Sequence, residues 1–194
     1  MPMQHKNLSD RPCPIARSLE RVGEWWSILI LRDAFQGVSR FDHFQKSLGI
    51  APNMLTRRLK TLTDSGLLER RLYSEKPPRY EYVLTDRGRD FLPVIWALVV
   101  WGNKHFSPEG EHIRIADAKT GELADPAMID RRTGRVLASA DFKIITGPAA
   151  SERLKLRYQD INRYFDEFID VAASSANPKG GSRKKTAKKA GASK

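Results

Sequence analysis

The fold of this chain is decided by residues 49–84, GIAPNMLTRRLKTLTDSGLLERRLYSEKPPRYEYVL. Pro52 suits the first turn of a helix, because its missing N–H would have no intrahelical acceptor there. The spacing after it predicts a helix over 52–65. One face of this helix is apolar and the other is polar and basic: Leu55, Leu59 and Leu62 against Asn53, Thr56, Arg57 and Lys60. Such a helix packs on a core through one face and leaves the other face in solvent.

A short helix precedes this one. Phe41, Phe44 and Leu48 share one face, and Gly49 ends the helix. Only a tight connection separates Gly49 from Pro52. Two helices joined by a turn of three or four residues form the helix-turn-helix pattern, whose second helix enters the major groove of DNA.

The residues that follow predict a β-hairpin. Leu68 and Leu72 belong to a first strand, and apolar and aromatic residues recur at period two in the return strand, at Tyr80, Tyr82 and Leu84. The charged connection at 74–79 is stiffened by two prolines. A hairpin directly after a helix-turn-helix is a wing, so residues 41–84 predict a winged helix-turn-helix.

Two helices are predicted before this region. Pro14 starts a helix that ends at Gly23 and has one apolar face of Ile15, Leu19 and Val22. Residues 24–35 form the next helix, which is apolar on most of its surface and is therefore expected in the middle of the core.

After the wing we expect one long helix. Thr85 is a suitable N-cap, Gly88 is a weak point and Pro93 predicts a kink. Phe91–Trp101 is apolar almost all round, so we expect this helix to be buried by other protein, such as a second subunit. The predicted dimer interface joins the first helix and the long helix through Ile15, Leu19, Val22, Trp96 and Trp101.

Composition divides the whole chain into four parts. We expect a flexible arm over 1–12, the winged helix-turn-helix domain over 13–106, an extension over 107–171 and a disordered basic tail over 172–194. The fold class is therefore mainly α with a β-hairpin wing, plus a small strand-rich C-terminal extension and a final helix.

Glycines and prolines punctuate the extension. Between them lie four strand-like pieces, at 112–115, 128–130, 135–138 and 142–145, and Thr133-Gly134 is typical of a hairpin turn. Ser151 caps a final helix with a narrow apolar seam made of Leu154, Tyr158, Ile161, Phe165 and Phe168. No internal repeat is evident.

The net charge of +11 comes from 34 Lys and Arg against 23 Asp and Glu. Seven of the cations lie in 178–194, which holds no acid, so the rest of the chain has 27 cations against 23 acids. This body is only mildly basic, and charge alone does not identify a nucleic-acid binder. The tail would add affinity for DNA by counterion release, without base specificity, or would serve only solubility.

Several classes of protein and site are excluded. The longest apolar run, Phe91–Trp101, is too short to span a membrane, and residues 1–14 lack an apolar signal core, so we expect a cytoplasmic protein associated with the nucleoid. The single cysteine forms no intramolecular disulfide, and His5, His43, His105 and His112 show no ligand spacing. No phosphate-binding loop or nucleophile elbow is present. We expect no metal, no cofactor and no enzymatic activity.

A series of motifs recurs in order between about residues 13 and 105: CPI at 13–15, RF at 40–41, ML at 54–55, GLL at 66–68, PPRYEYVLT at 77–85, LP at 92–93 and WG at 101–102. This series resembles the HxlR-type bacterial transcriptional regulators, which are winged helix-turn-helix proteins of MarR-like architecture. The resemblance implies a homodimer, sequence-specific binding to a palindromic operator, and repression or activation in response to small reactive molecules. The segment TGPAA at 146–150 is similar to the end of a strand-rich extension in longer relatives, but the paired cysteines of those relatives are absent here.

The pattern and the resemblance together predict which residues contact DNA. On helix 52–65 they are Asn53, Thr56, Arg57 and Lys60, since short polar side chains contact base edges while cations neutralise phosphates. In wing 75–79 they are Lys76 and Arg79, and Arg40 resembles a family position that touches phosphate. Arg58 is ambiguous, because its position beside Leu55 and Leu59 could turn it towards the body of the domain. The alternative interpretation is a solvated basic face and a charged hairpin tip that resists edge aggregation.

Two features favour sensing. Cys13 lies at or near a helix N-cap, where the helix dipole favours the thiolate, and a cysteine at this place senses quinones, aldehydes or oxidants in several members of the family. The alternative is an inert side chain packed at the dimer seam. An aromatic pocket between the second and long helices could hold an apolar effector.

The sequence therefore predicts a homodimeric regulator of transcription, such as a repressor, whose partners are double-stranded operator DNA, a second copy of itself and a small-molecule effector, with no membrane. Two alternatives stay open. One is a sensor or interaction protein that uses the winged domain for protein contacts. The other is a nonspecific DNA-binding protein driven by the basic tail.

Overall fold

The structure is a computed structural model that describes residues 8, 12–137 and 141–176. The predicted tail lies outside these residues from 177 onward, as does nearly all of the predicted arm. The chain forms two compact units, Met1–Met128 and Ile129–Lys194. This division falls inside the segment expected as one extension from residue 107.

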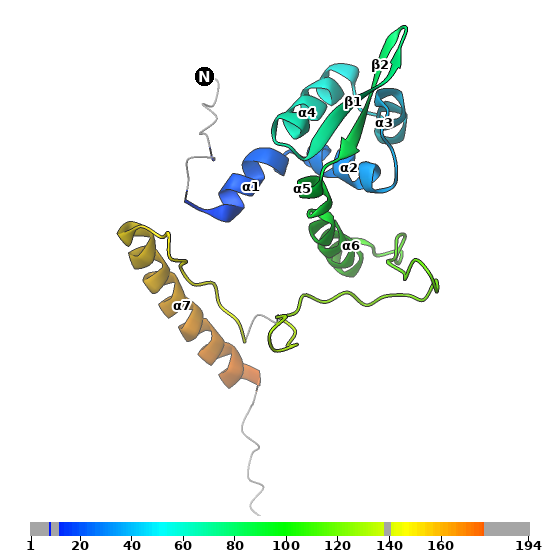
Figure 1. The fold of residues 1–194 in the computed structure, drawn as a ribbon. Helices are drawn as coiled ribbons and strands as arrows, with labels where there is room; N and C mark the ends of the chain where they lie inside the picture. Colours follow the sequence, from blue (N-terminus) through cyan, green and yellow to red (C-terminus); the bar gives the residue numbers. More distant parts are fainter. Residues whose placement is uncertain (1–7, 9–11, 138–140, 177–194) are drawn as a thin grey trace, which may run out of the picture. The chain divides into compact units, whose positions relative to one another are not determined.

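The first unit begins with four helices, α1 (Pro14–Val22), α2 (Trp25–Phe35), α3 (Phe41–Leu48) and α4 (Pro52–Asp64). Helix α2 is central, as the sequence predicts, and contacts α1, α3 and α4 (Figure 1). The hydrophobic core of this unit is a cluster of buried apolar side chains: Val22, Ile30, Leu31, Phe44, Ile50, Leu55, Leu59, Leu62, Leu67 and Leu68. The predicted helix-turn-helix is confirmed.

The turn between α3 and α4 depends on backbone geometry at both ends. Gly49 takes the left-handed conformation, with φ of 61°, and its N–H donates to the carbonyl of Gln45. Pro52 then occupies the first turn of α4. A side chain at position 49 would be strained in this conformation, which explains why glycine ends the helix there.

The wing consists of β1 (Leu68–Glu75) and β2 (Pro78–Leu84), paired antiparallel. Leu68 lies opposite Leu84 and Leu72 lies opposite Tyr80, with an irregularity between Leu72 and Ser74. Figure 1 shows the hairpin projecting beyond the helices. The predicted strand, loop and return strand are confirmed.

The segment before α3 pairs with the wing. The N–H of Tyr82 donates to the carbonyl of Ser39 at 2.7 Å, and the Ser39 hydroxyl donates to the Glu81 carboxylate at 3.2 Å. An isolated bridge joins Arg40 to Glu81. The wing is therefore fixed to the start of the helix-turn-helix as well as to its end.

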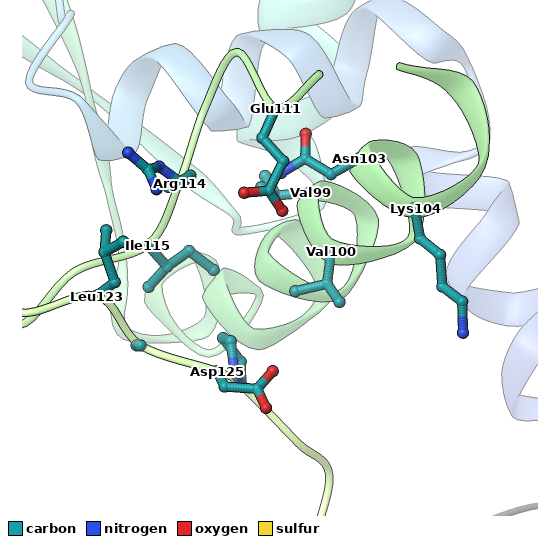
Figure 2. Close-up of a pocket in the computed structure, with 11 residues that line it drawn as sticks. Val99, Val100, Asn103, Lys104, Glu111, Arg114, Ile115, Leu123 and Asp125 are labelled. Carbon is teal, nitrogen blue, oxygen red and sulfur yellow. The ribbon is translucent and has the colours of Figure 1, made fainter. Parts of the chain in front are cut away.

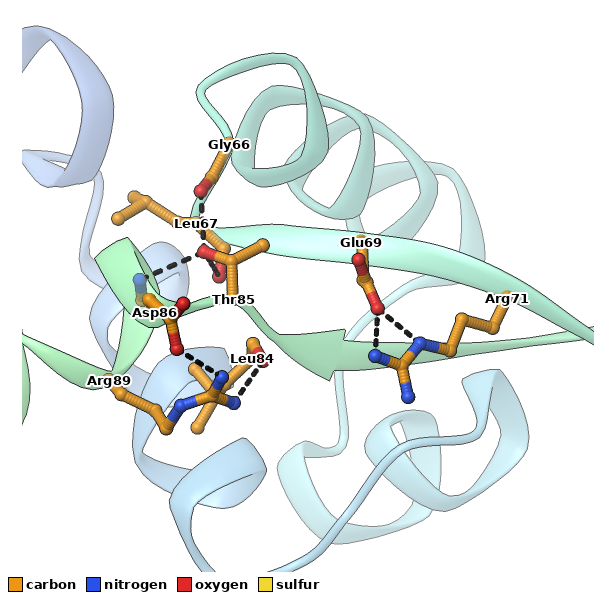
Figure 3. A network of polar contacts seen from close by, with 9 residues as sticks. Gly66, Leu67, Glu69, Arg71, Leu84, Thr85, Asp86 and Arg89 are labelled. Atoms are coloured by element: carbon orange, nitrogen blue, oxygen red, sulfur yellow. Dashed lines mark hydrogen bonds and ion pairs between the residues drawn. The ribbon is translucent and has the colours of Figure 1, made fainter.

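Thr85 joins the end of α4 to the segment after the wing (Figure 3). Its hydroxyl donates to the carbonyl of Gly66 at 2.6 Å and accepts from the N–H of Gly88 at 3.0 Å. This confirms Thr85 as an N-cap, here of the short helix α5 (Asp86–Arg89). Arg89 also donates to the carbonyl of Leu84 at 2.6 Å.

The expected single long helix is two helices. Helix α5 ends at Arg89, and α6 (Leu92–Phe106) starts after a short break. Pro93 lies in the first turn of α6 rather than inside a continuous helix. The prediction of a kink at Pro93 is therefore wrong, because a proline in a first turn costs no hydrogen bond.

Two turns in the C-terminal region have the same internal structure, one in each unit. They are Asp117–Gly121 and Asp130–Gly134, with the sequences DAKTG and DRRTG. In each, the glycine N–H donates to the carbonyl of the aspartate, and the aspartate N–H donates to the carbonyl one residue after the glycine. The two glycines have φ of 75° and 70°. The expectation of no internal repeat therefore overlooked a short Asp-x-x-Thr-Gly repeat that the sequence contains. The hydrogen bonds add that both copies form the same turn.

Extended strands are absent from the described part of the extension. Its only β pairing consists of isolated bridges, Ala116 with Leu123 and Ile129 with Val136. Of the four predicted pieces, only 128–130 and 135–138 are paired, through the bridge of Ile129 with Val136. The pieces 112–115 and 142–145 form neither strand nor bridge, so their prediction is wrong. The predicted final helix is present as α7 (Glu152–Ala176), and it continues past residue 171 into the segment expected to be a disordered tail.

The seam of α7 is described only in part. Leu154 and Tyr158 are half-buried and Ile161 is exposed, whereas the side chains of Phe165 and Phe168 lie outside the described residues. No helix in the described ranges combines the length and the apolar character that a membrane crossing requires.

Candidate nucleic-acid interface

The outward face of α4 carries the four residues predicted to contact DNA. Asn53, Thr56, Arg57 and Lys60 are all exposed, because Leu55, Leu59 and Leu62 bury the opposite face completely. Three of the four have local partners, and the first of these is Asn53, whose side-chain oxygen accepts from the N–H of Met54 at 2.8 Å. The Thr56 hydroxyl donates to the carbonyl of Pro52 at 2.8 Å, and Lys60 pairs with Asp64 at 2.6 Å. None of these contacts buries the side chain, so all three groups stay accessible.

Arg57 and Arg58 have opposite environments. Arg57 is exposed, has no ion pair with a described residue, and lines a hollow of about 520 Å³ beside Glu20 and Glu24. Arg58 is 7% exposed and pairs with Glu24 at 3.1 Å. The structure thus resolves the ambiguity of Arg58 in favour of the body of the domain, where it ties α4 to the start of α2.

The tip of the wing presents Lys76 and Arg79. Both side chains are exposed, and neither makes an ion pair with a described residue. The Ser74 hydroxyl donates to the carbonyl of Pro77 at 3.2 Å, which closes the tip. Two such cations can interact with an external anion without first breaking an ion pair to a described carboxylate.

Arg40 lies at the N-cap of α3 and is exposed. Its backbone bridges to Glu81, and its guanidinium lies over the ring of Tyr73 at 4.5 Å from the centroid. The stacked ring limits the motion of the arginine without neutralising its charge. Arg40 is therefore a positioned cation at the base of the wing.

Known proteins share both the sequence and the fold that carry this surface. Residues 21–110 match the model of the HxlR-like helix-turn-helix family. Over 141 residues, the chain is 40% identical to the uncharacterised HTH-type transcriptional regulator Rv3095 of Mycobacterium tuberculosis, covering 72% of this chain and 89% of that protein. The chain belongs to the HxlR-like helix-turn-helix family.

Solved structures agree with this assignment. The candidate transcription factor PA1374 of Pseudomonas aeruginosa is 52% identical, with a TM-score of 0.56 over 75% of this chain and 99% of that one. A second candidate transcription factor, PA1607, is 36% identical, with a TM-score of 0.65 over 72% of this chain and 98% of that one. This HxlR-like protein is thus a helix-turn-helix transcriptional regulator, and its family consists of DNA-binding regulators rather than enzymes.

The HxlR-like domain also carries cations that the sequence analysis did not select. Arg70 and Arg71 on β1 are exposed, and the Arg70 guanidinium lies 3.4 Å from the ring centroid of Tyr80. Arg71 pairs with Glu69. The period-two pattern that predicted the wing places Arg70 and Tyr80 on the same face of the hairpin. The contact between these two side chains could therefore have been predicted from the sequence.

Four of the five predicted interface residues lie on the surface of the HxlR-like domain. Ile15, Leu19, Trp96 and Trp101 are 61%, 51%, 41% and 55% exposed. Val22 is different, because it is 7% exposed and belongs to the core of the monomer. The exposed apolar surface of α6 also includes Val94 and Leu98, and Trp25 of α2 is 70% exposed.

Cys13 occupies the N-cap position of α1, as predicted. Its thiol is free and half-buried, and it makes no side-chain capping hydrogen bond. The carbonyl of Cys13 accepts from the N–H of Arg17 at 3.0 Å. Within the described ranges, no three His, Cys, Asp or Glu residues are grouped as a metal site requires.

Proposed function

We propose that this HxlR-like regulator binds a palindromic operator as a homodimer. The observation that carries the proposal is the outward face of α4, where Asn53, Thr56, Arg57 and Lys60 are exposed on a helix whose other face is fixed in the core. A helix of this kind fits the major groove. Because two copies are related by two-fold symmetry, their operator has matching half-sites.

The wing and Arg40 extend this surface along the DNA backbone. Lys76 and Arg79 contact phosphates or enter the minor groove, while Arg40 contacts a phosphate next to α3. These contacts add affinity and fix the register, whereas the side chains of α4 provide base specificity. We accordingly place the protein on the nucleoid.

The exposed apolar surface of α1 and α6 supports the homodimer. Exposed apolar side chains of this size are rarely left in solvent when they form one patch. Ile15 and Leu19 of α1 with Trp96 and Trp101 of α6 are the residues that we expect a second copy to cover.

Genomic footprinting identifies the operator, and Arg57→Ala then tests the proposal. We expect this variant to bind the operator about 10- to 100-fold more weakly and to discriminate less among bases, because an arginine at a base edge contributes about 1–3 kcal/mol. Arg131→Ala is the matched control, since Arg131 is an exposed cation in the other compact unit.

A version without residues 178–194 separates this function from its alternatives. If removal of the tail abolishes all DNA binding while Arg57→Ala changes nothing, the protein is a nonspecific binder driven by the tail. If the unchanged protein and both variants bind no DNA at all, the winged domain serves protein contacts instead.

We further propose that Cys13 makes operator binding sensitive to electrophiles and oxidants. The support is its free thiol at the N-terminus of α1, beside the apolar surface proposed for the dimer. Intact-mass spectrometry after treatment with a quinone or diamide detects modification, and Cys13→Ser is the control. An unmodified Cys13 with unchanged operator affinity would rule out this role.

A further inference from the structure

A hollow of about 380 Å³ lies between α6 and the first part of the extension (Figure 2). All of its lining residues belong to the first compact unit. The side-chain amide of Asn103 donates to the carbonyl of Ile113 at 2.8 Å and holds the extension against the helix. The volume lies in the range of small-molecule sites, which are about 300–1,000 Å³.

The floor of the hollow is apolar. Val99 and Val100 come from α6, and Ile115 and Pro126 come from the extension; all four are half-buried. In Figure 2, Val100 and Ile115 lie on opposite sides of the hollow. Such a floor favours an apolar group of modest size, because its burial removes apolar surface from water on both partners.

The rim carries charges of both signs: Lys104, Glu111, Arg114 and Asp125. All four are exposed, and none makes an ion pair with a described residue. Glu109, which is close to Glu111 in the chain, does have a partner, because its carboxylate lies 2.7 Å from the ring nitrogen of His112. Figure 2 shows Glu111 and Asp125 at opposite ends of the hollow, and Arg114 lines the same hollow.

We propose that this hollow binds a free α-amino acid with an apolar side chain. The guanidinium of Arg114 donates to the ligand carboxylate in the bidentate geometry that arginine favours. The carboxylate of Glu111 accepts from the ligand ammonium group. The apolar side chain of the ligand lies on Val100 and Ile115. A ligand with only one charge makes only one of these two charged contacts, with Arg114 or with Glu111.

Binding at this place also gives a route to regulation, and that part rests on the proposed function. The ligand touches α6, whose exposed apolar surface includes Trp96 and Trp101. A ligand that favours one position of the extension against α6 thereby changes the affinity of the dimer for its operator.

Calorimetry with the full chain and no DNA tests the binding itself. The probes are L-leucine and L-phenylalanine, with N-acetyl-L-phenylalanine and L-phenylalaninamide as analogues that lack one charge. We expect at least one of the two amino acids to bind with a Kd below about 1 mM. We expect L-phenylalaninamide and N-acetyl-L-phenylalanine to bind at least about tenfold more weakly than L-phenylalanine, because each loses a charged hydrogen bond.

Two conservative variants locate the site. Arg114→Gln and Glu111→Gln each weaken binding by about tenfold or more, whereas Arg131→Gln, outside the hollow, leaves binding unchanged. Circular dichroism confirms that each variant is folded. The proposal is overturned if neither amino acid binds, if the analogues bind as well as L-phenylalanine, or if both rim variants bind normally.

Operator affinity separates the two proposals. Without ligand, Arg114→Gln binds the operator like the unchanged protein, because Arg114 is not on the proposed DNA surface. Failure of the unchanged protein to bind any operator refutes the proposed function and leaves the calorimetric result valid. An operator affinity that L-leucine and L-phenylalanine do not alter refutes the regulatory part.

Discussion

Neighbouring residues of this HxlR-like protein have opposite roles when they lie on different faces of one helix. Arg57 and Arg58 have the same side chain, yet one lies in solvent and the other is buried against Glu24. A charge in the core of a domain stabilises it only while its partner remains, whereas a charge on the surface is available to a ligand.

Arg58→Ala is expected to lower the free energy of unfolding by about 2 kcal/mol, because it removes a buried aliphatic chain and leaves Glu24 without its partner. Urea unfolding measures this change. Arg57→Ala is the control and should unfold like the unchanged protein. A stable Arg58→Ala variant that no longer binds the operator would mean that Arg58, rather than Arg57, faces DNA.

Gly88→Ala is expected to destabilise the domain by about 3 kcal/mol, because overpacking a dense site forces the backbone to move. An added Cβ would lie 2.1 Å from the carbonyl oxygen of Leu67 and 3.1 Å from a methyl carbon of Leu84. Gly102→Ala provides the contrast. Among the described residues, no atom beyond the backbone of its own helix and its chain neighbours lies within 4 Å of a Cβ at that position, so alanine should raise helix stability by up to about 1 kcal/mol. Thermal unfolding measures both effects. A lower midpoint temperature for Gly88→Ala together with a higher one for Gly102→Ala supports close packing at Gly88, and equal shifts of the two midpoints contradict it.

At the scale of elements, hydrogen bonds fix each functional segment to the core. The wing is held at its base by Ser39 and by Thr85, while its tip carries cations without described ion-pair partners. The two Asp-x-x-Thr-Gly turns are each closed by an aspartate that accepts hydrogen bonds from its own loop, including the N–H groups of Lys119 and Arg132.

Replacing both Lys76 and Arg79 with alanine should weaken binding to all DNA sequences alike, because these side chains contact phosphates in the proposed complex. The slope of log affinity against log salt should fall in magnitude by about two, since each of the two cations neutralises one phosphate. A salt titration of fluorescence anisotropy measures this slope. An unchanged slope with altered base preference would instead place the wing on base edges.

Acidification should open the two turns before it unfolds the domain core. Hydrogen bonds from Thr120 and Lys119 lower the pKa of Asp117, and bonds from Thr133 and Arg132 lower the pKa of Asp130, both from an ordinary value of 3.8. A lowered pKa in the folded state means that the stabilisation is complete above pH 3.8 and is lost as the pH falls through the lower folded value.

Amide hydrogen exchange of Gly121 and Gly134 against pH checks this expectation. In Asp117→Asn, protection of Gly121 should no longer depend on pH in this range, while Gly134 serves as the internal reference. Protection that falls already at neutral pH would show that the aspartates do not control the turns.

At the scale of the molecule, the monomer leaves a large apolar surface exposed. Helix α6 has only Ile95 fully buried, although most of its residues are apolar. The proposed dimer would remove this apolar surface from water, and burial of apolar surface is the main favourable term in association.

Trp96→Glu is expected to convert the proposed dimer to a monomer, since it places a charge in the proposed interface and leaves the core untouched. Light scattering coupled to size-exclusion chromatography measures the mass. Leu72→Glu is the control, because Leu72 is 51% exposed on the wing and should leave the mass unchanged. A chain that is monomeric before any substitution would refute the homodimer.

The sequence by itself determined the winged helix-turn-helix. Leucines at helical spacing, Gly49 and Pro52 at the turn and the period-two hairpin act locally, so residues close in the chain suffice to specify them. The outward position of Asn53, Thr56, Arg57 and Lys60 followed from the same periodicity.

Only the tertiary structure decided where long-range contacts form. It assigned Arg58 to Glu24 and Val22 to the core, broke the long helix before Pro93 and revealed the repeated turns. It also brought α6 and residues 111–126 around one hollow. Most of these features depend on packing between segments that are distant in the chain. A periodic sequence pattern describes one segment and does not say which other segment packs on it, whereas the free energy of burial depends on which surfaces meet.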